Sequence, residues 1–240
     1  MHSVKLDKTR NVGELIELSG DLNDGARLLD PPYPPITIRE LDLRPMAADW
    51  EYLPYTQEMH LSVQSSTYLE TAAHLFPERE KIGDIGLERL FPSAVVLQIP
   101  RGPNEKVTAA DIESTLERAR EQISPGDALL IATGYDRFAE PSGDRSPRFR
   151  YDAVEWAVQH DCSILGSDMS NWQDPDEKPS FFPMFFRSQT LLLAPMTNLT
   201  AVPMARIQMI VMPLKIEGAC ASPCRVVGIL PSSTQTTPSI

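Results

Sequence analysis

The stretch TAADIESTLERAREQISPGDALLIATGY, residues 108–135, decides the fold. It opens with Thr108 and Asp111, which have the spacing of a capping box with Asp in place of the usual Glu. Pro125 and Gly126 then form a turn signal, and the apolar run ALLIATG that follows predicts a buried strand. The apolar residues between cap and turn recur every three or four positions, as in a helix: Ile112, Leu116, Ala119 and Ile123.

The rest of the chain repeats this alternation of helix and strand. A second helix is predicted at 150–160, because Ala153, Trp156 and Ala157 share one face. The order of strand, helix, strand, helix and strand, followed by a run of strands, predicts an α/β fold with a mixed sheet. Further apolar runs of strand length lie at 14–19, 94–100, 162–168, 190–195, 207–216 and 225–230.

The chain length predicts one large domain with its own core. We expect this domain to span residues 12–230, after a flexible N-terminus at 1–11 and before a disordered tail at 231–240. The proline-rich segment at 30–35 and the polar segment at 139–148 are expected to be loops.

The charge balance argues against several partners. The chain has 33 acidic and 22 basic residues and a formal net charge of -11, which disfavours nucleic acid and anionic membrane surfaces. No apolar run approaches the roughly 20 residues that span a bilayer, and residues 1–15 lack the apolar core of a secretory signal. We therefore expect a cytoplasmic protein without a membrane partner.

The three cysteines do not form a disulfide framework, and reduced thiols agree with a cytoplasmic location. Cys220 and Cys224 are spaced C-x-x-x-C without a second pair of ligands. We therefore interpret them as small buried thiols near a strand end rather than as a zinc knuckle.

A second stretch, QSSTYLETAAH at 64–74, carries the chemistry-bearing residues. It places polar groups at even spacing ahead of His74, as a site laid along an extended segment would. On such a segment, Glu70 and His74 would point the same way. A carboxylate beside an imidazole raises the pKa of the imidazole and orients it, which suits acid or base catalysis, although a buried hydrogen-bonded pair is the alternative.

Segments along nearly the whole chain resemble the metal-dependent cyclase family, which includes bacterial-type kynurenine formamidase and isatin hydrolase. The resemblance implies the swivelling β/β/α fold and a homodimer or homotetramer. Coverage is roughly residues 12–230, in this order: LIELSGDLNDG, TAADIE with ISPGDALLIATGYDRF, DCSILGSDMSNW, LLLAPMTNLTAV and MPLKIEGACASPCRVVGI.

The defining motif of that family is H-x-G-T-H-x-D-x-P-x-H, and the chain departs from it. Thr67 and His74 match it, Glu70 replaces an Asp, and Gln64 and Tyr68 stand in place of two histidines. A later His and Glu of the family fall near Phe182 and Ala194, which cannot bind a metal. A catalytic metal needs about three protein ligands. The resemblance therefore implies a metal-free site without cofactors, with one weakly held zinc or manganese ion as the alternative.

The candidate catalytic residues are Gln64, Tyr68, Glu70 and His74. His74 with Glu70 would activate the attacking water or substrate hydroxyl, and Tyr68 and Gln64 would hold the carbonyl oxygen. For Tyr68 and Gln64 the alternative is a structural role, as buried side chains whose polar atoms are hydrogen-bonded within the fold.

Further residues are candidates for substrate binding. Thr67 belongs to the motif, and Asp168 ends a predicted strand, where it would either orient His74 or cap the following turn. Phe182 and Phe185 lie in the aromatic patch at 180–186, which would line an apolar pocket or pack in the core or between subunits. Trp50 and Tyr52 would close over a ligand or over a partner subunit.

The sequence thus predicts a hydrolase or cyclase that acts on an amide, lactone or related carbonyl of a small, ring-bearing metabolite. Similarity to kynurenine formamidase and a role in secondary metabolism are expectations from analogy. The alternatives are a non-catalytic protein that binds a small ligand in the same pocket, and a single-metal hydrolase with altered ligands.

Overall fold

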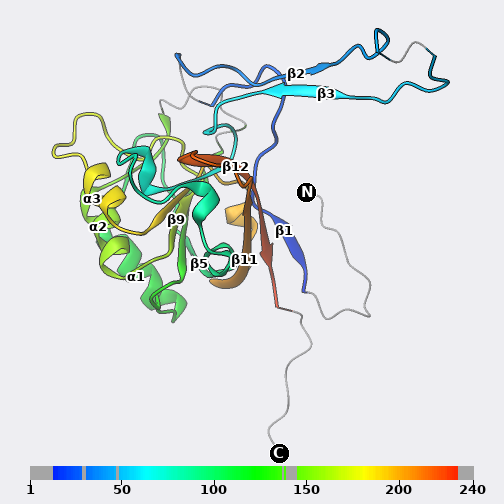
Figure 1. Ribbon diagram of the computed structural model, residues 1–240. Coiled ribbons are helices and arrows are strands. Elements are labelled where there is room, and N and C mark those ends of the chain that lie inside the picture. The colour runs from blue at the N-terminus through cyan, green and yellow to red at the C-terminus, as the bar shows by residue number, and fades with distance from the viewer. Residues whose placement is uncertain (1–12, 29–30, 47–48, 137, 139–144, 232–240) are drawn as a thin grey trace, which may run out of the picture.

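Seven strands of mixed direction close into a barrel in the computed structural model, which describes residues 13–28, 31–46, 49–136, 138 and 145–231 (Figure 1). The order around the barrel is β12-β11-β5-β7-β9-β10-β4, and β4 pairs again with β12. The strand β1 (Leu15–Glu17) adds to the outside of this circuit by pairing with β12. The barrel strands are β4 (Tyr68–Glu70), β5 (Ser93–Gln98), β7 (Ala128–Ala132), β9 (Ile164–Ser167), β10 (Leu191–Ala194), β11 (Arg206–Pro213) and β12 (Ala221–Ile229).

The four central strands β5, β7, β9 and β10 are parallel neighbours. Every residue of β7, β9 and β10 is buried, as expected for parallel strands that are covered on both faces. One face packs against the helices α1 (Ala109–Ala119), α2 (Tyr151–Gln159) and α3 (Phe182–Arg187), which Figure 1 shows together on one side. The predicted single α/β domain with a mixed sheet is confirmed.

The stretch at 108–135 folds largely as its sequence predicts. The Thr108 hydroxyl accepts a hydrogen bond from the Asp111 amide at 3.2 Å, and the Asp111 carboxylate accepts one from the Thr108 amide at 2.8 Å. Helix α1 nevertheless ends at Ala119, four residues before the predicted end, because Arg120 adopts a left-handed conformation with φ of 55°.

The polar stretch at 64–74 is extended only over β4. Thr71 then caps a short 3₁₀ helix, η1 (Ala72–His74), because its hydroxyl accepts from the Ala73 amide. The prediction of one extended segment as far as His74 is therefore wrong. The local reason is that the Thr71 side chain and carbonyl draw the following residues into a turn.

Residues 182–186 of the aromatic patch belong to helix α3, with Pro183 in its first turn, where proline is tolerated. Phe185 is 0% exposed and packs against Trp172 with ring centroids 6.0 Å apart. Of the alternatives expected for Phe185, the structure shows packing in the core. Phe182 is only partly buried.

A two-stranded hairpin, β2 (Thr37–Glu40) with β3 (Gln57–His60), extends away from the barrel (Figure 1). Nearly all its strand residues are exposed. Its connecting segment carries Trp50 and Tyr52, which are 56% and 80% exposed. A second short pair, β6 (Lys106–Val107) with β8 (Arg148–Phe149), lies beside the helices.

The predicted flexible segment 1–11, residues 232–240 of the predicted tail, and most of the predicted loop at 139–148 lie outside the described residues. Among the described helices, none has the length and apolar character to cross a membrane.

Candidate active site

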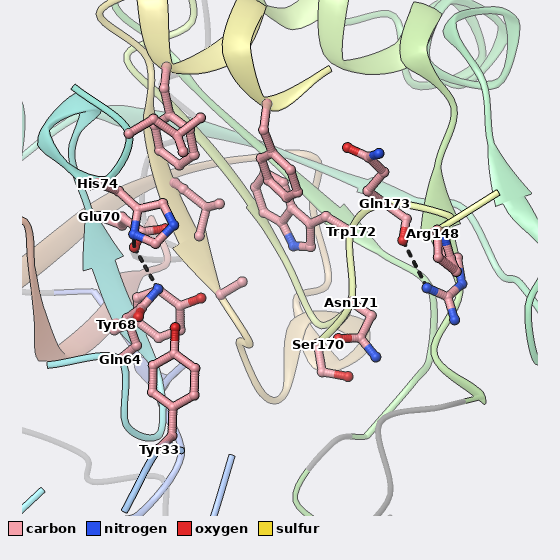
Figure 2. A pocket seen from close by; sticks show the side chains of 16 residues that line it. Tyr33, Gln64, Tyr68, Glu70, His74, Arg148, Ser170, Asn171, Trp172 and Gln173 are labelled. Atoms are coloured by element: carbon pink, nitrogen blue, oxygen red, sulfur yellow. Dashed lines mark hydrogen bonds and ion pairs between the residues drawn. The ribbon is translucent and has the colours of Figure 1, made fainter. Parts of the chain in front are cut away.

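A cavity of about 530 Å³ opens between β4, η1, α3 and the segment that follows β9. Figure 2 shows Gln64, Tyr68, Glu70 and His74 on one side of it. We call these four residues the polar corner. The wall beside them is mainly aromatic and aliphatic, and consists of Trp172, Phe182, Phe186, Leu192 and Ala194. The structure thus brings all four predicted catalytic residues and Phe182 to one cavity.

Strand register positions the polar corner. In β4, Tyr68 lies opposite Ala194 and Glu70 lies opposite Leu192 of β10. Because side chains alternate along a strand, Tyr68 and Glu70 share the cavity face, while Leu69 points to the core on the other side.

Glu70 is the centre of the polar corner. Its side chain is 3% exposed, and its Oε1 accepts a hydrogen bond from Nε2 of Gln64 at 2.7 Å. The same oxygen lies 3.0 Å from Nδ1 of His74. A buried carboxylate needs such partners, because desolvation without them is costly.

His74 sits at the end of η1 with 32% of its side chain exposed. Hydrogen bonds with Cys220 and with Glu70 raise the pKa of His74 to about 10, against the opposing effect of burial. Its ring lies 5.4 Å from that of Phe186, measured between centroids.

Tyr68 is buried, and this burial together with the nearby charge of Glu70 raises the pKa of its phenol well above the usual value. The hydroxyl therefore keeps its proton at neutral pH and stays a hydrogen-bond donor.

Cys220 belongs to this site, although the sequence reasoning set it aside as a structural thiol. One side-chain donor atom from each of Glu70, His74 and Cys220 lies within 4.8 Å of the other two. No local signal in the sequence points to Cys220, because only the pairing of Ala221 in β12 with Glu70 in β4 brings it next to the motif. The other two cysteines fit the interpretation as inert thiols, because burial raises the pKa of Cys162 to about 12 and that of Cys224 above its usual value.

Two other predicted residues have structural roles and lie outside the cavity wall of the described structure. Thr67 accepts a hydrogen bond from the Gly20 amide and donates one to the Pro195 carbonyl. Asp168 accepts hydrogen bonds from the amides of Thr133 and Gly134. The proposed contact of Asp168 with His74 is therefore wrong: the carboxylate ties the end of β9 to the end of β7.

The remaining predicted substrate-binding residues also lie elsewhere. Phe185 is in the core behind the cavity wall, and Trp50 and Tyr52 are on the exposed hairpin connection. Their separation from the cavity has two causes. The hairpin leads Trp50 and Tyr52 away from the barrel (Figure 1), while helix α3 turns Phe185 inward.

Sequence reasoning missed the side of the cavity opposite the polar corner. There Arg148 of β8 donates a hydrogen bond to the carbonyl of Gln173 at 2.8 Å, and Ser170 and Asn171 lie close by (Figure 2). The indole nitrogen of Trp172 and the hydroxyl of Ser170 are buried without a hydrogen-bond partner in the described part of the chain. Arg148, Ser170, Asn171 and Gln173 thus make this side of the cavity polar.

The donor set decides how many metal ions the site could hold. Phe182 and Ala194, where the family resemblance expects a further His and Glu, both line the cavity and supply no donor atom. A two-metal arrangement therefore does not fit. Glu70, His74 and Cys220 supply three donors, which fits one ion.

Comparisons with known proteins agree with the fold. The family model Cyclase, described as "Putative cyclase", matches residues 16–174. Cyclase-like protein 1 of Arabidopsis thaliana is 22% identical over 178 residues, which cover 71% of this chain and 68% of that protein.

Solved structures are similar over almost the whole chain. An isatin hydrolase bound to the product analogue thioisatinate is 21% identical with a TM-score of 0.79, covering 91% of this chain and 92% of that one. Isatin hydrolase A from Ralstonia solanacearum is 19% identical with a TM-score of 0.76, covering 90% and 91%. A potential metal-dependent hydrolase with cyclase activity is 18% identical with a TM-score of 0.70, covering 90% and 96%. Since the family model covers more than half of its length, this chain belongs to the Cyclase family.

Proposed function

We propose that this protein is a hydrolase or cyclase that acts on an amide, lactone or related carbonyl of a small, ring-bearing metabolite. The observation that carries the proposal is a single cavity in which a hydrogen-bonded polar corner faces aromatic walls. Membership of the Cyclase family supports it, as do the hydrolase names of similar structures.

The aromatic walls of the cavity favour a substrate that carries a ring. Trp172, Phe182 and Phe186 offer flat apolar faces, and the cavity volume of about 530 Å³ suits a small metabolite. Burial of one aromatic ring against such walls supplies binding energy that is independent of the chemical step.

The polar corner acts on the carbonyl. The Tyr68 hydroxyl donates a hydrogen bond to the carbonyl oxygen, where negative charge develops as the carbon is attacked. One N–H of the Gln64 amide donates to Glu70, so Gln64 orients the carboxylate. Its second N–H can donate to the carbonyl oxygen, as the sequence predicts.

Glu70 and His74 direct the attacking oxygen, which belongs to water in a hydrolysis and to a substrate hydroxyl in a cyclisation. In the metal-free reaction predicted from the sequence, the two act as an acid–base pair. The second candidate is a reaction with one ion held by Glu70, His74 and Cys220, and the convergence of these donors favours it. Such an ion, when bound, would polarise the carbonyl and lower the pKa of water.

The test is turnover of a panel of aromatic N-acyl amides, lactams and lactones. We expect turnover by the wild type, a large loss in Glu70→Gln, and wild-type rates in Glu78→Gln, a matched change of an exposed carboxylate outside the cavity. Equal rates in the wild type and Glu70→Gln would contradict the proposal. Absence of turnover together with a ligand-induced rise in melting temperature would instead support the non-catalytic binding protein.

A further inference from the structure

We propose that Glu70, His74 and Cys220 bind one thiophilic divalent ion, of which zinc is the reference case, at the wall of the cavity. The inference deepens the proposed function and rests on it only for its catalytic consequence, because metal binding can be measured without a substrate.

The three donor atoms are arranged compactly. All three donor atoms lie within 4.8 Å of one another, and Nδ1 of His74 is 3.0 Å from Oε1 of Glu70. In a nucleophilic Cys–His–carboxylate relay, sulfur and carboxylate contact opposite nitrogens of one ring and stay roughly 7 Å apart, two hydrogen-bond lengths plus the ring. The observed separation is too short for that relay, whereas donors that converge on one point are what an ion requires.

The chemical types of the three donor groups suit zinc. A thiolate, an imidazole and a carboxylate are three accepted zinc ligands, and three protein ligands with a free position are the usual set of a catalytic zinc. The sulfur disfavours magnesium, calcium and manganese, which prefer oxygen ligands. Cys220 thus distinguishes zinc from manganese, which the sequence alone leaves as equal alternatives.

The fold holds all three donor residues in place through Thr71. The amide and hydroxyl of Thr71 both donate to the Cys220 carbonyl, at 2.9 and 3.1 Å. The Thr71 carbonyl accepts from the His74 amide at 3.1 Å, and Thr71 directly follows Glu70 in the chain. The donors are therefore positioned by backbone contacts that do not depend on the ion.

The Glu70 carboxylate is itself held by a hydrogen bond. Ligating carboxylates in metal sites are themselves hydrogen-bonded, and Gln64 supplies that contact to Glu70. Glu70 and His74 both line the cavity, so an ion bound between them is within reach of a substrate.

The experiment uses chelator-treated full-length protein titrated with Zn²⁺ and with Co²⁺. We expect one ion per chain by elemental analysis after dialysis, and a sulfur-to-cobalt charge-transfer absorption with Co²⁺. Cys220→Ser should lose this absorption and bind Zn²⁺ more weakly by more than a hundredfold, since even the loss of a group that only hydrogen-bonds to a ligand costs about 10–100-fold. Cys224→Ser, which removes a partly buried thiol from β12 four residues after Cys220, should behave as the wild type.

A second readout guards against misfolding of the variant. In the wild type, alkylation of Cys220 mapped by mass spectrometry should slow on addition of Zn²⁺, while Cys162 and Cys224 show no change. Absence of a retained ion, or equal affinity in Cys220→Ser and the wild type, would overturn the inference.

The two proposals fail in different ways. Turnover that survives complete metal removal would overturn the ion's catalytic role and leave the hydrolase. One tightly held ion without turnover of any carbonyl substrate would leave the metal site and remove the proposed function.

Discussion

Gln64 donates a hydrogen bond from its amide nitrogen to Oε1 of Glu70 over 2.7 Å, and the two residues are 9% and 2% exposed. Gln64 stands where the family resemblance expects a histidine ligand. Here the residue supports a carboxylate instead of contributing a donor of its own. The polar corner is therefore a rearranged site, with defined contacts between its members.

Gln64→Leu should test this support. Without the amide, Glu70 keeps only the His74 contact, and we expect kcat/KM to fall by about 10–100-fold, the usual cost of losing a group that orients a reacting one. The folding free energy should fall by about 1–3 kcal/mol in urea denaturation, because a buried acceptor loses a partner. Unchanged kcat/KM would show that Gln64 is only a packing residue.

Tyr68→Phe removes one hydroxyl and keeps the ring. If this hydroxyl stabilises the developing oxyanion, kcat should fall by about 10²–10³-fold while KM changes little. Tyr151→Phe, on helix α2 outside the cavity wall, serves as the control for loss of a phenol. If KM instead rises while kcat stays unchanged, so that kcat/KM falls by the same factor, Tyr68 acts in ground-state binding.

Asp168→Asn should alter the dependence of stability on pH. Burial raises the pKa of Asp168 from 3.8 to about 6, so the folded chain binds this proton more tightly than the unfolded chain. The corresponding stabilisation is fully present below about pH 4 and is lost as pH rises through about 6, by about 3 kcal/mol. Unfolding free energies measured from pH 4 to 7 should show this decline in the wild type, and a flatter profile in the variant. Parallel profiles would contradict the shift.

The hairpin connection should mediate self-association into a dimer or tetramer. Isolated two-stranded hairpins are marginal in water, and this one exposes Trp50 and Tyr52. Light scattering at micromolar concentration should give a multiple of the 26.8 kDa chain mass, and Trp50→Glu with Tyr52→Glu should reduce it. Glu51→Gln is the control in the same segment. A wild-type mass near one chain would contradict this expectation.

Phe185→Ala should test the packing of the core behind the cavity wall. Phe185 is fully buried, so Phe185→Ala should cost about 3–5 kcal/mol of stability rather than dissociate an oligomer. Chemical denaturation measures this loss of unfolding free energy. A loss under about 1 kcal/mol would show that the core tolerates the cavity left by Phe185→Ala.

The fold and half of the site were accessible from the sequence because their signals are local. The capping residues Thr108 and Asp111 and the apolar run at 128–132 act within one helix and one strand. The four residues of the polar corner lie within eleven positions, so their grouping needs no knowledge of the topology.

The remaining parts depend on contacts between distant segments. Cys220 meets Glu70 only through the pairing of β12 with β4, and Asp168 meets Thr133 only because β9 lies beside β7. Helix α3 is short and aromatic, and its formation depends on the core that covers Phe185, which outweighs weak local helix preference.

The triple pairing of β12 with β1, β4 and β11 has a consequence for the order of folding. The pairing of β12 with β4 closes the barrel and at the same time brings Cys220 next to Glu70. These two residues are 150 positions apart in the chain. Contacts of such sequence separation form late and slowly, because loop closure must come before them. A partly folded chain would therefore hold its parallel strands and helices while lacking the third donor, so the proposed metal site would be complete only after the barrel closes.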